Sequence, residues 1–215
     1  MGECSVPQKR RLLNHRNPLL CMKVLGISGS PRKGGNTETI LTAFMKGAED
    51  SGAETKIVRL ADLSYKNCRG CNACCKKGVC VLSDDITPLL EEVLSVDVLV
   101  LASPIYSMTM TADLKGFIDR GQVLWARKFI TKTLKFSNEY VNNHIGVFLS
   151  TSGKDIPHVF DAAFPVARAF LHDAGFSYEE NVLFPGMDEK GGAKVWTESS
   201  DEAYARGKEI ADRLK

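Results

Sequence analysis

Length, composition and charge restrict the class of protein. The chain has 215 residues, 44% of them hydrophobic and 25% charged, which suits one folded domain and not a disordered chain. The net charge of +2 is too small for a nucleic-acid binder whose affinity rests on phosphate neutralisation, and no apolar run approaches the roughly 20 residues that cross a bilayer. We therefore expect neither nucleic acid nor a membrane as a partner.

The first residues differ from the rest of the chain. Residues 1–21 carry four basic residues and one acidic residue without clear periodicity. No apolar segment follows the basic residues, so the sequence does not predict a signal peptide. We expect residues 1–21 to be an extension and residues 22–215 to form the domain.

From residue 22 onward, β-rich runs alternate with helical patterns. The predicted strands are residues 23–28, 55–60, 97–102, 144–150 and 176–184. Helical spacing of apolar residues fills the intervals, at about residues 40–48, 86–93, 112–129, 157–174 and 200–214. A capping-box pattern from Ser199 to Glu202 marks the start of the last helix. This alternation implies an open parallel sheet with helices on both faces.

The segment Gly29–Thr37 lies between the first predicted strand and the first helix, where open α/β sheets bind phosphates. Gly34 and Gly35 let backbone N–H groups approach a ligand, and Arg32 adds positive charge. The side-chain donors here are Ser28, Ser30, Asn36 and Thr37. The segment fits neither GxxxxGK[ST] nor GxGxxG, and its hydroxyl groups suit one terminal phosphate, such as that of FMN. An ordinary glycine-rich turn is the alternative.

Two further loops follow later strands and suit the same ligand. The loop Ser103–Met108 comes after the third strand, where Pro104 stiffens the chain and Tyr106 offers a flat surface to a ring. We expect flavin contacts from Pro104, Ile105, Tyr106, Ser107 and Met108. The loop Ser150–Gly153 follows the fourth strand and repeats the small hydroxyl side chains. We expect contacts there from Thr151, Ser152 and Gly153, beside Gly35 of the first loop.

Two of these motifs together resemble a known family. GSPRKGGNT after the first strand and SPIYSMTMTADLKGFIDR after the third are similar to motifs of the flavodoxin-like NAD(P)H-dependent FMN reductases. The resemblance runs from about residue 22 to the end of the chain. It implies a three-layer α/β/α sandwich with a five-stranded parallel sheet of order 2-1-3-4-5. It also implies that FMN is bound, with NAD(P)H as a donor.

The same resemblance assigns roles to the residues of both motifs. It places the FMN phosphate on Ser30, Arg32, Asn36 and Thr37, and the isoalloxazine ring on residues 104–108. Asp119 and Arg120 close the second motif. They form either an ion pair on a helix surface or a cofactor contact, and the sequence leaves this choice open.

Cysteines are concentrated in the loop of residues 64–86. Of seven in the chain, five lie within thirteen residues, at Cys68, Cys71, Cys74, Cys75 and Cys80. Secreted disulfide-bonded proteins are usually shorter and spread their cysteines, so we expect a reducing cytoplasm and metal-binding thiolates. The C-x2-C-x2-C-x5-C spacing favours an iron–sulfur cluster over tetrahedral zinc, which usually takes two separated C-x2-C pairs. Zinc and free thiols remain as alternatives.

Within the reductases, this cysteine run resembles that of the iron–sulfur flavoproteins. The resemblance implies an oxygen-sensitive [4Fe–4S] cluster on Cys68, Cys71, Cys74 and Cys80. Cys75 is left over, either as a buried thiol or as a substitute ligand if the loop shifts by one residue. The resemblance also implies a homodimer or homotetramer in which the cysteine loop lies near the flavin of another subunit.

These expectations combine into an oxidoreductase that passes electrons between a [4Fe–4S] cluster and FMN, with a ferredoxin-like protein as a candidate electron donor. The cofactors carry such chemistry, so no acid–base catalyst is predicted. One alternative is an NAD(P)H-dependent FMN, quinone or nitro-compound reductase without a working cluster. Another is a non-enzymatic flavin redox sensor or a zinc-stabilised interaction module.

Overall fold

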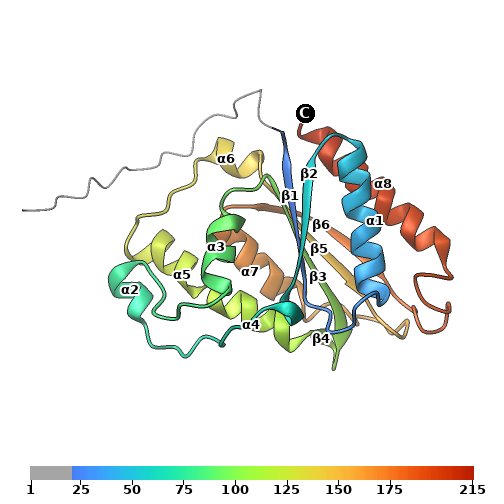
Figure 1. Ribbon diagram of the computed structural model, residues 1–215, viewed down its shortest axis with the longest axis horizontal. Helices are drawn as coiled ribbons and strands as arrows, with labels where there is room; N and C mark the ends of the chain where they lie inside the picture. Colours follow the sequence, from blue (N-terminus) through green and yellow to red (C-terminus); the bar gives the residue numbers. More distant parts are fainter. Residues whose placement is uncertain (1–20) are drawn as a thin grey trace, which may run out of the picture.

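The computed structural model describes residues 21–215 (Figure 1). All but the last residue of the expected extension, 1–21, lies outside the described residues. A parallel sheet runs through the middle, with helices on both of its faces. The expected α/β class is therefore confirmed.

Five parallel strands form the sheet in the order β2-β1-β3-β5-β6. They are β1 (Lys23–Ser28), β2 (Glu54–Arg59), β3 (Val98–Tyr106), β5 (Ile145–Thr151) and β6 (Ser177–Phe184). Counted along the chain, these strands have the predicted order 2-1-3-4-5. The prediction of five strands was incomplete, because β4 (Thr109–Met110) pairs antiparallel with the end of β3 and adds a sixth.

Different sets of helices cover the two faces of the sheet (Figure 1). One face carries the first and last helices, α1 (Asn36–Asp50) and α8 (Thr197–Arg213). The other face carries α3 (Ile86–Val93), α4 (Ala112–Arg120), α5 (Gln122–Trp125) and α7 (Phe164–Ala174). The shorter elements are η1 (Leu60–Asp62), α2 (Ala73–Lys77), the π-helical turn η2 (Ala126–Ile130) and α6 (Asn138–Asn142).

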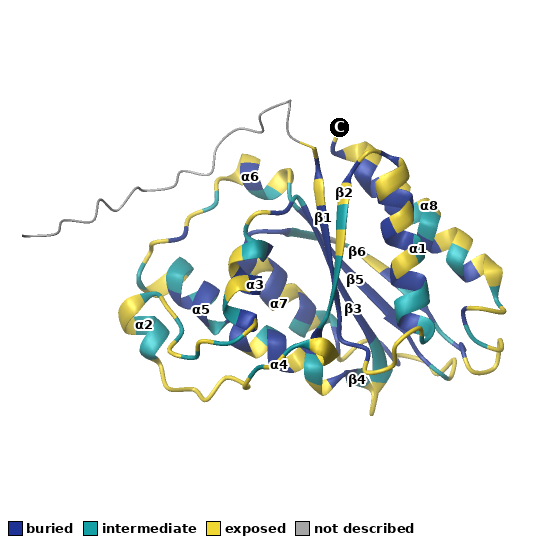
Figure 2. Ribbon diagram, in the orientation of Figure 1, coloured by how far each residue is buried: buried dark blue, intermediate teal, exposed yellow. Residues whose placement is uncertain are grey.

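The central strands are apolar because helices cover both of their faces. Residues 98–103 and all of β5 are buried, and Figure 2 shows these strands as the darkest part of the molecule. On α1, buried Ile40, Leu41 and Phe44 face the sheet, as the predicted helical spacing requires. Exposed residues lie along the outer faces of α1 and α8 (Figure 2). Two apolar cores result, one on each side of the sheet.

The structure corrects three local expectations. The third strand continues to Tyr106, through a segment predicted as loop, because Ser103 and Pro104 pair with β5 and the last two residues pair with β4. The helix predicted from residue 157 begins only at Phe164. The last helix begins at Thr197 instead of near residue 200, so Ser199 lies inside it and donates its hydroxyl to the Trp196 carbonyl at 2.7 Å instead of capping. Among residues 21–215, no helix is long and apolar enough to cross a membrane.

Candidate functional site

The three loops singled out in the sequence meet at the carboxyl edge of the sheet, near β4 in Figure 1. They enclose an open pocket of about 470 Å³, within the range of roughly 300–1,000 Å³ that small-molecule sites occupy. Parallel strands bring their carboxyl ends to one edge, which explains why loops so distant in sequence form one site.

The first loop presents the start of α1 to this pocket. Gly35 is the N-cap residue of α1, and no side chain caps the helix, so backbone N–H groups of the first turn are available to a ligand. Thr37, in that first turn, is buried, and its hydroxyl lies 2.7 Å from the Thr151 hydroxyl at the end of β5. The first turn of α1 therefore suits an anionic group, and Arg32 lines the same pocket.

The second loop forms a tight reversal between β3 and β4. Ser107 and Met108 adopt left-handed backbone conformations, with φ of 49° and 67°, which non-glycine residues rarely hold. Such conformations cost on the order of 1–3 kcal/mol each and cluster at ligand sites. The reversal leaves Tyr106 and Met108 exposed at the rim of the pocket.

Buried hydroxyl groups fasten the three loops to one another. Ser150 donates to the Ser103 carbonyl at 2.7 Å, which joins the end of β5 to the end of β3. Thr111 donates to the Gly29 carbonyl at 2.7 Å, which joins the start of α4 to the first loop. These bonds connect neighbouring strand ends directly, so the loops are held in a fixed relation before a ligand binds.

The structure gathers the predicted flavin contacts with one exception. The pocket is lined by Ser30, Arg32, Gly35, Asn36, Thr37, Pro104, Ile105, Tyr106, Ser107, Met108, Thr151, Ser152 and Gly153. Ser28 does not line it, because this last residue of β1 is fully buried in the sheet. Their contact with FMN itself remains a prediction.

Sequence reasoning missed five residues that also line the pocket, namely Lys154, Ile156, Val159, Met187 and Asp188. Lys154 directly follows the third loop. Met187 and Asp188 follow β6, whose end lies on the same edge of the sheet, and their backbone N–H groups donate to Ser152 and Gly153. Extending the strand-end rule to the fifth strand would have found them.

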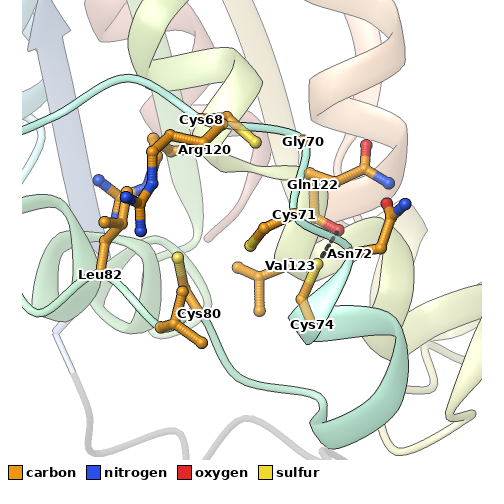
Figure 3. Close-up of a pocket in the computed structure, with 12 residues that line it drawn as sticks. Cys68, Gly70, Cys71, Asn72, Cys74, Cys80, Leu82, Arg120, Gln122 and Val123 are labelled. Carbon is orange, nitrogen blue, oxygen red and sulfur yellow. Dashed lines mark hydrogen bonds between the residues drawn. The ribbon is translucent and has the colours of Figure 1, made fainter.

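A second cavity collects the four predicted cluster ligands. Cys68, Cys71, Cys74 and Cys80 all line it. Figure 3 shows Cys80 on the side of Arg120 and Leu82, and Cys74 on the side of Asn72 and Gln122. The Cys74 thiol lies 3.9 Å from the Gln122 carbonyl. Burial and then the neighbouring Cys75 raise the pKa of the Cys74 thiol.

Left-handed turns make this wrapping possible. Gly70 and Gly78 have φ of 64° and 67°, on either side of the short helix α2, a conformation that glycine adopts at little cost. Asn72 adopts the same region at the N-cap position of α2, without a side-chain capping bond. The three turns let cysteines from thirteen residues of chain face one space from several directions.

The donor set of this cavity suits an iron–sulfur cluster. Four thiols, none of them in a disulfide, converge from one loop, and [4Fe–4S] clusters are held by four cysteine thiolates. Cys75 does not line the cavity, which agrees with the predicted ligand set. In the part of the chain that the structure describes, no three Cys, His, Asp or Glu side chains are close enough together to hold a single metal ion.

Asp119 and Arg120 differ in their surroundings, and only Asp119 forms the surface ion pair that was one of the two expectations. Asp119 forms a surface ion pair with Lys115 at 2.7 Å. Arg120 is buried and donates to Asp84 at 2.6 Å and to the Lys66 carbonyl at 2.7 Å. Burial would raise the pKa of Asp84, but the guanidinium outweighs it and holds that pKa below its usual value. Arg120 thus anchors the cysteine loop and also lines its cavity.

The fold and the three-loop pocket define a flavodoxin-like protein with a ligand site at the carboxyl edge of its sheet. Residues 22–159 match the model of the NADPH-dependent FMN reductase family, and the chain belongs to this family. This membership confirms the predicted family.

Comparison with named proteins finds similar chains among the iron-sulfur flavoproteins. The chain is similar to an iron-sulfur flavoprotein of Archaeoglobus fulgidus, at 44% identity over 46% of this chain and 45% of the relative. It is also similar to an iron-sulfur flavoprotein of Methanosarcina thermophila, at 35% identity over 61% of this chain and 64% of the relative. The matched segment therefore spans less than two thirds of either relative.

Solved structures agree on the fold. An NAD(P)H:quinone oxidoreductase from Methanothermobacter marburgensis superposes with a TM-score of 0.63 at 16% identity, covering 89% of this chain and 98% of that one. At such low identity the superposition establishes the shared fold alone.

Proposed function

We propose that this protein holds FMN in the three-loop pocket and a [4Fe–4S] cluster in the cysteine cavity, and that it transfers electrons between the two. The observation that carries the proposal is that one chain of the FMN reductase family encloses a cavity lined by four free cysteines. The names of the two archaeal relatives support the same pairing of cofactors.

The residues of the flavin pocket divide the task of binding. The uncapped first turn of α1 and Arg32 suit the phosphate, since both offer positive charge or N–H donors. Tyr106 and its neighbours in residues 105–108 line the pocket at the reversal after β3, which supports their contact with the flat flavin ring. The hydroxyl pair of Thr37 and Thr151 fixes the first turn of α1 to the end of β5.

When both groups are bound, FMN supplies two-electron or one-electron chemistry and the cluster supplies one-electron chemistry. The expected reaction takes one electron from each of two reduced ferredoxin-like donors and delivers the pair, with two protons from water, to a two-electron acceptor such as a quinone. The protein's own contribution is to bind, orient and tune the two groups.

We further propose that the functional unit is a homodimer or homotetramer. The two cavities have no lining residue in common, and the cysteine loop lies beyond α5, away from β4 in Figure 1. Large apolar side chains are exposed near both sites: Val79 and Val81 in the cysteine loop, and Tyr106, Met108 and Ile156 at the flavin pocket. A neighbouring subunit that covers both patches would bring a cysteine loop to another chain's flavin.

Anaerobic purification followed by counting of cofactors tests the proposal. About one FMN and four irons with four sulfides per chain, and a protein larger than a monomer by light scattering, are the expected results. FMN without iron after reconstitution would contradict the cluster and leave an NAD(P)H-dependent flavin reductase. Zinc without iron, and no turnover with any donor, would favour the interaction module. A monomer with full cofactors and electron transfer would contradict the oligomer.

A further inference from the structure

Arg120 is the most deeply buried charged group at the cysteine cavity. Its side chain is 1% exposed, yet it is one of the residues that line this space. Its Nε–H has no hydrogen-bond partner among residues 21–215. A buried N–H that donates to nothing is costly, so a charged side chain in this state points to an acceptor that completes it.

The other nitrogens of the guanidinium are already engaged. Nη1 donates to Asp84 at 2.6 Å and to the Lys66 carbonyl at 2.7 Å, and Nη2 lies 3.4 Å from the Thr87 hydroxyl. These bonds fix the orientation of the planar group, and Nε is its one nitrogen without a hydrogen-bond partner among the described residues. The structure therefore holds Arg120 in one position instead of leaving it to swing with the loop.

Cys80 lines the cavity and lies close enough to interact with this cation. Burial would lower the pKa of Arg120, but the Asp84 carboxylate and the Cys80 thiol outweigh burial and raise it. Figure 3 shows Cys80 on the same side of the cavity as Arg120. Within the described chain, no carboxylate lines the cavity, and the only other cationic residue there, Arg69, is exposed.

We propose that Arg120 is a positioning residue of the cysteine site, which donates a hydrogen bond from Nε to a sulfur at Cys80 and places one fixed positive charge beside the bound cluster. This inference rests on the proposed cluster. A cluster held by four thiolates is an anion and gains negative charge on reduction, so a hydrogen bond and a cation at its sulfur stabilise the reduced form. Arg120 therefore raises the reduction potential of the cluster.

Three variants separate charge from packing. In Arg120→Gln the cation is lost, and we expect the cluster potential to move to more negative values. In Asp84→Asn the carboxylate that partly cancels this cation is lost, and we expect a move to more positive values. In Arg120→Lys the charge remains without the planar N–H donors, and we expect a smaller negative shift than in Arg120→Gln. Loss of either partner would loosen the loop in the same way, so potential shifts of opposite sign in Arg120→Gln and Asp84→Asn cannot arise from loosening.

Arg120→Gln alone leaves the buried Asp84 carboxylate without its ion-pair partner, and this variant could fail to fold for that reason. A second comparison therefore uses variants that avoid this unpaired charge. The double variant D84N/R120Q carries no unpaired charge, and its potential should lie below that of Asp84→Asn alone. Potentials are read by anaerobic redox titration of the reconstituted proteins, after each has been shown to hold four irons. Equal potentials in Asp84→Asn and the double variant would overturn the inference.

The proposed function and this inference fail in different ways. If the wild-type protein takes up no iron, the proposed function fails, and with it the cluster on which this inference rests. If the protein takes up four irons but Asp84→Asn and D84N/R120Q have equal potentials, the inference alone fails.

Discussion

Thr37 and Thr151 bring their side-chain oxygens to 2.7 Å of each other although 114 positions separate them in the chain. Thr37 lies in the first turn of α1 and Thr151 ends β5, and both are buried at the flavin pocket. One hydroxyl pair therefore connects the first turn of α1 to the third loop. It makes the position of the helix N-terminus depend on the sheet edge.

Substitution of Thr37 by Val tests the importance of that pair. The variant keeps the shape of the side chain but removes a donor to the phosphate and leaves Thr151 without its partner. We expect FMN to bind about tenfold more weakly, since a hydrogen bond to a charged group contributes roughly 1.5 kcal/mol. Titration of the apoprotein with FMN, followed by flavin fluorescence, measures this change. Thr42→Val, on the exposed face of the same helix, should bind FMN like the wild type.

Arg32 should distinguish FMN from riboflavin. If its guanidinium faces the phosphate, Arg32→Gln weakens FMN binding by about tenfold, as expected for loss of one charge-assisted contact, and leaves riboflavin binding unchanged. The wild-type preference for FMN should also fall as salt is added, because the residue is exposed and its charge is screened. Equal losses for both flavins would show that Arg32 shapes the loop instead of binding the phosphate.

The sequence predicted the sheet well because its signals are local. Continuous apolar runs and helical spacing depend on residues that are neighbours in the chain, and β1 matches its predicted bounds at Lys23–Ser28. The error at β3 has a non-local cause. Residues 103–106 carry loop-like Ser and Pro, but pairing with the end of β5 and then with Thr109–Met110 extends the strand.

The residues of the two sites also divide into those that local sequence signals predict and those that depend on distant parts of the chain. The pocket residues on the first three loops could be predicted because strand ends of a parallel sheet share one edge. Asp188 was missed because the strand-end rule was not extended to the fifth strand, and nothing local distinguishes this residue from other loop carboxylates. The role of Arg120 was also hidden, since its partner Asp84 lies 36 positions away.

Cys74 and Cys75 offer a matched test of the ligand set. Cys74 lines the cavity and Cys75, one residue on, does not. We expect Cys74→Ser to lose the cluster and Cys75→Ser to keep four irons per chain after anaerobic reconstitution, because a serine hydroxyl is a poor substitute for a thiolate ligand. The reverse pattern would show that the loop shifts by one residue when the cluster binds. FMN content, which depends on the other site, is the control for folding.

Gly207 should tolerate no side chain. An added Cβ would lie 1.9 Å from the Phe44 carbonyl oxygen, where α8 crosses α1. Alanine normally favours a helix over glycine by about 1 kcal/mol, so the sign of the effect decides between propensity and packing. We expect Gly207→Ala to lower the free energy of unfolding by about 3 kcal/mol in urea. Ala205→Gly, on the exposed side of the same helix, should lower it by only about 1 kcal/mol.

Tyr140 should make the protein sensitive to alkali. Burial, and then the charge of Asp97, raise the pKa of its hydroxyl from 10.0 to about 12. Between these values the unfolded chain releases the proton while the folded chain retains it. The unfolded state thus binds fewer protons, and stability, complete below pH 10, falls as pH rises towards 12. The loss from this group is on the order of 2 kcal/mol.

Tyr140→Phe removes the hydroxyl whose ionisation makes the stability depend on pH. The hydroxyl is buried with no hydrogen-bond partner in the described residues, so its loss should cost little at pH 8. Urea unfolding measures this effect at pH 8 and at pH 11.5. Between these values the free energy of unfolding of the wild type should fall by on the order of 2 kcal/mol more than that of the variant. Tyr106→Phe, whose ring is exposed, should follow the wild type at both values. Parallel behaviour of Tyr140→Phe and the wild type would show that the Tyr140 hydroxyl ionises as readily in the folded protein as in the unfolded chain.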